Sequence, residues 1–132
     1  MLVERAYAAL EHSYSPYSHF RVGAALLTAS GGIYTGCNIE NGAYSPTNCA
    51  ERTAFFKAVS EGERNFSAIA VVGEAADALE DSGPTYPCGV CRQVMLEFCN
   101  PDTFEVVLGT RTAEPIVLKL ADLAPYGFYL QK

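Results

Sequence analysis

The sequence predicts an α/β protein, a three-layer α/β/α sandwich around a mixed sheet of five strands. The main observation is the order of its periodic segments, which runs helix, hairpin, helix, strand, helix, strands. The second is size and composition, because 132 residues of which 49% are hydrophobic suit one domain with its own core. No repeat or long linker divides the chain, so residues 1–132 are expected to form a single domain.

The first half of the chain gives helix and hairpin signals. Residues 22–28 are almost continuously apolar, as in a strand covered on both faces, and residues 33–38 are typical of the returning strand of a hairpin. A loop over residues 39–47 leads to a second helix over about 48–61. The opening segment has apolar residues at helical spacing, namely Val3, Ala6, Tyr7, Leu10 and Tyr14.

The second half supplies the remaining elements. Residues 66–72 are expected to form a third strand, and residues 74–84, with carboxylates and no basic residue, to be a solvated surface segment. A third helix should run from about 88 to 100. Strands over 104–108 and 115–118 and a short helical turn then complete the chain. Helices before and between the strands predict a sheet covered on both faces.

Charge and cysteine content narrow the possible functions. The formal net charge is -6 and the nine Lys and Arg residues are dispersed, which argues against a nucleic-acid partner and favours a small neutral substrate. The sequence has no apolar run near the roughly 20 residues that cross a bilayer, and its N-terminus does not resemble a signal peptide, so the cytoplasm is the expected location and no membrane is involved. Five cysteines, an odd number, favour metal or catalytic thiols over disulfides.

Two cysteine motifs predict a metal site. Cys88 and Cys91 are three residues apart, so both thiols can face one metal ion from a single helical turn. Cys49 supplies a third thiol at the start of the preceding helix, where unpaired N–H groups stabilise thiolate. Three thiolates leave an open position on a zinc ion, as catalytic sites do.

A carboxylate and two guanidinium groups accompany these thiols. Glu51 lies two residues after Cys49 and can transfer protons to and from water that a metal activates. Three thiolates on a dication leave a net charge of about -1, which a nearby cation would offset. Arg52 and Arg92 are the candidates, and Arg52 is favoured because it shares a helix face with Cys49.

These segments resemble the cytidine deaminases, specifically their small homotetrameric class. The resemblance rests first on Cys49–Arg52 and Pro87–Gln93, which match the zinc-deaminase signature. Tyr14–Leu26 is similar to the family's N-terminal block and Gly36–Asn41 to its nucleoside-binding block. The chain departs from the family at Gly42, at Tyr86 and in the C-terminal segment 124–128.

The resemblance implies a reaction and a set of site residues. The reaction is zinc-dependent hydrolysis of cytidine and deoxycytidine to uridine and deoxyuridine with release of ammonia, a step of pyrimidine salvage. One Zn²⁺ per subunit would be held by Cys49, Cys88 and Cys91, and Glu51 would shuttle protons. A homotetramer with active sites shared between subunits is also implied. The residues expected to contact the nucleoside are Asn38 and Glu40 at the ribose, Phe20 and Ala50 at the base, and Tyr44 and Phe128 across subunit boundaries.

Other interpretations of the same residues stay open at this point. Cys88 and Cys91 could form a redox pair or a structural zinc knuckle with Cys37 as a fourth ligand, and Glu51 could cap a helix. Two rival functions are a deaminase of another aminopyrimidine, such as blasticidin S, and a non-catalytic zinc-stabilised binding module.

Overall fold

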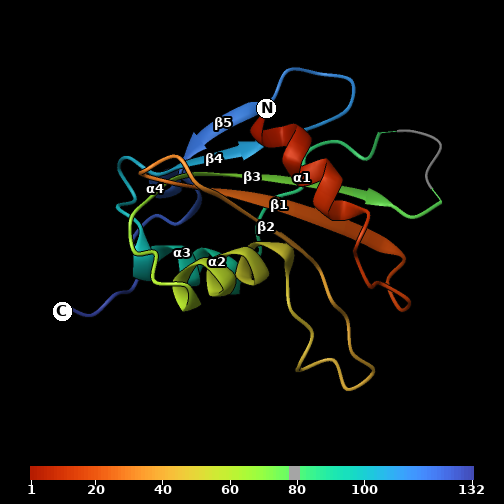
Figure 1. Ribbon diagram of the computed structural model, residues 1–132, viewed down its shortest axis with the longest axis horizontal. Helices are drawn as coiled ribbons and strands as arrows, with labels where there is room; N and C mark the ends of the chain where they lie inside the picture. Colours follow the sequence, from red (N-terminus) through yellow and green to blue (C-terminus); the bar gives the residue numbers. More distant parts are fainter. Residues whose placement is uncertain (78–80) are drawn as a thin grey trace.

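The computed structural model describes residues 1–77 and 81–132, and within them it confirms the predicted fold class (Figure 1). Five strands form one mixed sheet in the order β2-β1-β3-β4-β5. The strands are β1 (Phe20–Thr28), β2 (Ile33–Cys37), β3 (Phe66–Ala75), β4 (Glu105–Leu108) and β5 (Ile116–Lys119). The helices are α1 (Leu2–Leu10), α2 (Ala50–Ser60), α3 (Gly89–Phe98) and α4 (Leu120–Leu123).

The direction of the strands follows from their connections. β1 pairs antiparallel with β2 through a short turn and antiparallel with β3 on its other side. β3 and β4 are parallel, so a crossover is needed between them, and this segment carries α3. β5 returns antiparallel to β4 at the edge of the sheet.

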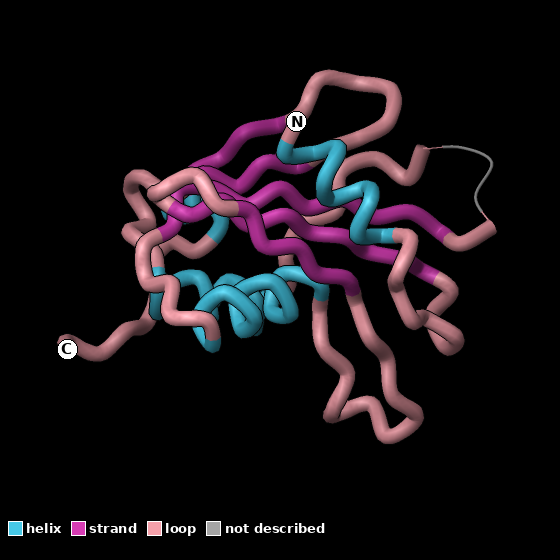
Figure 2. Tube along the Cα trace, in the orientation of Figure 1, coloured by secondary structure: helices cyan, strands magenta, loops and turns pink. Residues whose placement is uncertain are grey.

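Helices cover both faces of the sheet, and this divides the core in two (Figure 1; Figure 2). α1 packs on one face, where Ala6 and Leu10 contact the small residues of the central strands. α2 and α3 lie together on the other face, where Phe55 and Met95 are fully buried against the larger strand residues. Neighbouring residues of β1 and β3 point to opposite faces and are buried on both, as the continuous apolar runs predict.

The first turn of α2 lies directly against β2. A Cβ added to Gly36 in β2 would lie 2.6 Å from the backbone nitrogen of Ala54, so no side chain fits between the strand and the helix. This close approach sets the position of the start of α2, and therefore of the residues that precede and begin that helix.

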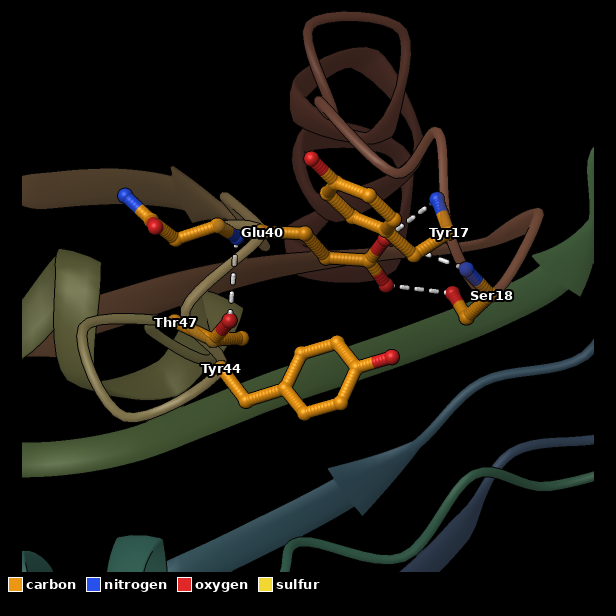
Figure 3. Close-up of a pocket in the computed structure, with 6 residues that line it drawn as sticks. Tyr17, Ser18, Glu40, Tyr44 and Thr47 are labelled. Atoms are coloured by element: carbon orange, nitrogen blue, oxygen red, sulfur yellow. Dashed lines mark hydrogen bonds between the residues drawn. The ribbon is translucent and has the colours of Figure 1, made fainter.

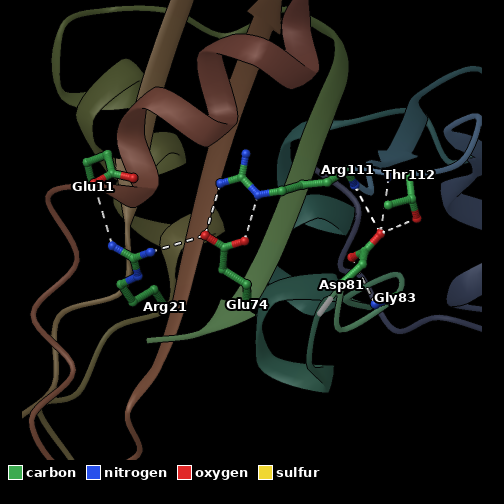
Figure 4. A network of polar contacts seen from close by, with 7 residues as sticks. All are labelled: Glu11, Arg21, Glu74, Asp81, Gly83, Arg111 and Thr112. Carbon is green, nitrogen blue, oxygen red and sulfur yellow. Dashed lines mark hydrogen bonds and ion pairs between the residues drawn. The ribbon is translucent and has the colours of Figure 1, made fainter. Parts of the chain in front are cut away.

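Two sequence expectations need correction. The opening helix ends at Leu10 rather than near Tyr14, because Tyr14 forms a bridge with Ile39 instead. The third strand extends to Ala75, and Glu74 is not solvated: its side chain is 15% exposed and binds Arg21 and Arg111 (Figure 4). Residues 78–80 of the same acidic stretch lie outside the described residues.

In the two described ranges, none of the helices has both the length and the apolarity needed to pass through a membrane.

Candidate active site

Three cysteine thiols meet where the two neighbouring helices begin. Cys49 is the N-cap residue of α2, Cys88 is the N-cap residue of α3, and Cys91 lies in the first turn of α3. Their sulfur atoms all lie within 4.8 Å of one another. The backbone N–H of Cys91 donates to Sγ of Cys88 over 3.5 Å, as an unpaired donor of a helix N-terminus can.

The cluster fits a zinc ion. Zinc–sulfur bonds of about 2.3 Å in tetrahedral geometry place two sulfurs about 3.8 Å apart. The observed distance between Sγ of Cys49 and Sγ of Cys88 is 3.7 Å. Among the residues that the structure describes, Cys37 is outside this cluster, so the protein supplies three ligands and leaves one position for a non-protein ligand.

Arg52 compensates the charge of the thiols. Its Nη2 donates to Sγ of Cys49 over 3.2 Å. The pKa of Cys49 is lowered by a hydrogen bond with Cys91 and by the guanidinium of Arg52, although burial acts in the opposite direction. Arg92, the other candidate, is directed elsewhere: its Nη1 donates to the backbone oxygen of Leu123 over 2.7 Å.

Glu51 is buried beside the thiols, in the first turn of α2, with 4% of its surface exposed. Burial raises the pKa of Glu51 to about 7, and the negative charge of Cys49 acts in the same direction. A carboxyl group with this pKa can both accept and donate a proton near neutral pH.

A cavity of about 230 Å³ is lined by Glu51 and by two of the three cysteines, Cys49 and Cys88. Of the residues expected to contact the nucleoside, Asn38, Glu40 and Ala50 line this cavity. The remaining lining residues, apart from Cys49, Glu51 and Cys88, had not been expected from the sequence; they are Val22, Thr47, Asn48, Thr85 and Tyr86. For three of them the sequence could have indicated a place in the cavity, because they adjoin the cysteine motifs: Thr47 and Asn48 directly precede Cys49, and Tyr86 precedes Pro87.

The other three expected contact residues do not line this cavity in the described part of the chain. The ring of Phe20 lies over Gly73, since a Cβ there would be 2.8 Å from its Cε2 atom. Tyr44 is 73% exposed and lines a neighbouring cavity of about 390 Å³ together with Tyr17 and Glu40 (Figure 3). Phe128 is 67% exposed, and its backbone oxygen accepts a hydrogen bond from Gln93.

Comparison with known proteins shows which family the chain is similar to. Residues 1–109 match the model of the family described as the cytidine and deoxycytidylate deaminase zinc-binding region. The chain belongs to this deaminase family. A cytidine deaminase from Sporosarcina psychrophila is 61% identical over 99 residues, which are 75% of this chain and 68% of that protein. One from Halalkalibacterium halodurans is 48% identical over 128 residues, which are 97% of this chain and 92% of that protein.

Solved structures of the deaminase family extend the comparison to the fold. The cytidine deaminase from Burkholderia pseudomallei superposes with a TM-score of 0.87 at 50% identity, covering 96% of each chain. The protein is therefore a hydrolytic deaminase with a zinc-binding thiol cluster.

Proposed function

We propose that this deaminase converts cytidine and deoxycytidine to uridine and deoxyuridine, with release of ammonia. The observation that carries the proposal is the buried carboxylate of Glu51 beside the three-thiol cluster, in a cavity that also contains Asn38 and Glu40. The relatives named above as cytidine deaminases support the choice of substrate.

Cys49, Cys88 and Cys91 would hold the zinc ion, one per subunit. When bound, zinc supplies the Lewis acidity that makes a water molecule a nucleophile at neutral pH. Arg52 offsets the negative charge of the thiolates, which would otherwise weaken that effect.

Glu51 moves the protons of the reaction. The oxygen of water forms a bond to C4 of the cytosine ring, and the bond between C4 and the amino nitrogen breaks. The carboxylate of Glu51 accepts one proton of the water and delivers it to N3 of the ring, whose double bond to C4 opens as the oxygen adds. It then takes the second proton from the oxygen now on C4 and passes it to the amino group, which leaves as ammonia while the C4 carbonyl of uridine forms. Its raised pKa suits both halves of this transfer, and its burial keeps bulk water away from the carboxylate.

The remaining expected roles form part of the same proposal. Asn38 and Glu40 hydrogen-bond the sugar, the backbone of Ala50 meets the polar edge of the base, and Phe20 packs beside the pyrimidine. The exposure of Tyr44 and Phe128 in one subunit supports their use in the active site of a neighbour, within a homotetramer. The single domain 1–132 would act in cytoplasmic pyrimidine salvage.

The decisive experiment measures ammonia release from cytidine by the zinc-loaded protein and its Glu51→Gln variant. The parent should release ammonia, and the variant should keep zinc and fold while its turnover falls by roughly three orders of magnitude. Glu61→Gln, at the other end of the same helix, is the matched control and should retain parental activity.

Two results would count against the proposal. Full activity of Glu51→Gln would remove the proton-transfer role from this residue. A parent that binds zinc but leaves cytidine unchanged would indicate a different aminopyrimidine as the substrate.

A further inference from the structure

The segment between α1 and β1 is paired with the segment that carries Asn38 and Glu40. The backbone N–H of Tyr14 donates to the oxygen of Asn38 over 3.0 Å, and the N–H of Glu40 donates to the oxygen of Tyr14 over 2.8 Å. This pairing places residues 13–18 directly beside the side chains of Asn38 and Glu40. The hydroxyl of Ser13 donates to Asn38, and the hydroxyl of Ser18 donates to Glu40.

The amide of Asn38 is almost fully occupied by the protein itself. Its Oδ1 accepts from the backbone N–H of Val22 over 2.9 Å and from the hydroxyl of Ser13. Its Nδ2 donates to the backbone oxygen of Phe20 over 2.9 Å. An amide has two acceptor positions and two N–H donors, so within the described residues one N–H of Asn38 is left for a ligand.

The carboxylate of Glu40 is held in a similar way (Figure 3). Its Oε1 accepts from the backbone N–H groups of Tyr17 and Ser18 over 3.0 and 3.1 Å, and its Oε2 accepts from the hydroxyl of Ser18. A carboxylate offers about four acceptor positions, so among the residues that the structure describes about one, on Oε2, is left for a ligand.

We propose that Ser13 and Ser18 are positioning residues of the sugar site. Their hydroxyl groups fix Asn38 and Glu40 so that the pair presents one N–H donor and one carboxylate acceptor to the cavity. A hydroxyl group both accepts and donates a hydrogen bond, so this pair of free positions matches one sugar hydroxyl. The inference rests on the proposed function, since it assigns the two serines to the recognition of the nucleoside sugar.

A role in folding alone has to be separated from this positioning role. The oxygen of Ser18 also accepts from the backbone N–H of Phe20 at the start of β1, over 3.0 Å. Loss of the hydroxyl could therefore loosen the fold locally, which would lower the activity on every substrate to the same extent. A positioning role affects only substrates that carry the hydroxyl.

The test compares cytidine with 2′,3′-dideoxycytidine, which keeps the base and lacks both secondary sugar hydroxyls. Zinc-loaded parent, Ser13→Ala and Ser18→Ala are assayed on each substrate. We expect the KM for cytidine to rise roughly tenfold in Ser18→Ala and roughly threefold in Ser13→Ala, with kcat little changed. The kcat/KM for the dideoxy analogue should stay at the parental value in both variants.

Two further variants complete the design. Ser18→Thr keeps the hydroxyl and should restore the parental KM for cytidine. Ser60→Ala removes a serine hydroxyl that donates to the backbone oxygen of Lys57, far along α2 from its catalytic end, and should leave both substrates unaffected.

Three outcomes would overturn the inference. Equal losses on cytidine and on the dideoxy analogue would assign the serines to folding, and unchanged kinetics on both would deny them any role. Both of these results leave the proposed function intact if the parent deaminates cytidine. A parent without that activity would overturn the proposed function and this inference together.

Discussion

Arg52 donates a hydrogen bond to the sulfur of Cys49 from one turn further along α2, over 3.2 Å. The two residues are spaced i and i+3, so the same helix start presents a metal ligand and the cation that stabilises it. Because three thiolates carry more charge than one zinc ion neutralises, this contact bears on how firmly the metal is held.

Replacing Arg52 by alanine should weaken zinc binding by roughly 10- to 100-fold, as loss of a partner of a metal ligand does. The pKa of Cys49 should rise, because the hydrogen bond with Cys91 and the guanidinium of Arg52 both lower it and the variant would lose the second. Competition with a chelator measures the affinity. Arg64→Ala is the control, since within residues 1–77 and 81–132 Arg64 hydrogen-bonds only the backbone oxygens of Val59 and Glu63. Zinc binding as tight as the parent's in Arg52→Ala would contradict the prediction.

The three-thiol site predicts which cysteines the metal content depends on. Cys88→Ser should reduce bound zinc well below one ion per subunit and abolish deamination. Cys37→Ser should retain the ion, because Cys37 lies outside the cluster. Elemental analysis of the purified proteins gives the ratio of zinc to protein. Loss of zinc from Cys37→Ser would instead indicate a closed site with four protein ligands.

Glu74 predicts a dependence of stability on pH. The pKa of Glu74 is lowered chiefly by the hydrogen bond from Arg111. Burial acts in the opposite direction, and the charges of Arg111 and Arg21 lower the pKa further. A carboxyl whose pKa is lower in the folded state contributes stability above its unfolded pKa, and this contribution is lost as the pH falls through the folded pKa. Glu74→Gln should therefore lower the free energy of unfolding at neutral pH by about 1 kcal/mol.

The same variant should match the parent once the pH lies below the folded pKa of Glu74. Urea denaturation at neutral and acidic pH measures both values. Glu105→Gln, which breaks an ion pair with Lys119 whose side chains are both 46% exposed, is the control and should change stability less at neutral pH. A deficit of Glu74→Gln that persists unchanged in acid would show that charge is not its cause.

Alanine substitutions at two glycines near the site, Gly36 and Gly89, should differ in their effects because only Gly36 is tightly packed. Gly36→Ala would push the first turn of α2 from the sheet, and should cost about 1–3 kcal/mol of stability and displace Glu51. Gly89 lies between two metal ligands in the sequence, yet a Cβ there meets no atom of the described residues within 4 Å, so Gly89→Ala should keep the zinc and the stability. Thermal unfolding and zinc content of both proteins test this contrast.

The fold was predictable where local signals were strong. The hairpin of β1 and β2, the helix that follows Cys49 and the buried strand β3 were all expected within a few residues of their observed bounds. The prediction was wrong where tertiary contacts decide the outcome. Nothing local to Tyr14 indicates a bridge to Ile39, and nothing local to Glu74 indicates its two arginine partners.

The candidate site was predictable to the extent that its chemistry lies in short motifs. The spacing of Cys88 and Cys91 and the position of Glu51 after Cys49 are properties of single helical turns, so they could be recognised from the sequence. Ser13 and Ser18 could not, because their contacts with Asn38 and Glu40 join segments more than twenty residues apart. The roles expected of Phe20, Tyr44 and Phe128 stay predictions.

The metal ligands also have a topological consequence. Cys49 and Cys88 are 39 residues apart, and the inner strand β3 runs between them. An ion bound to both would close this loop as a disulfide does, a constraint worth about 4 kcal/mol in chain-entropy terms, but one that a chelator can remove. A molecule that loses its ion would lose its chemistry and this cross-link together. Inactive molecules would then be the first to unfold, which makes them the preferred targets of proteolytic quality control.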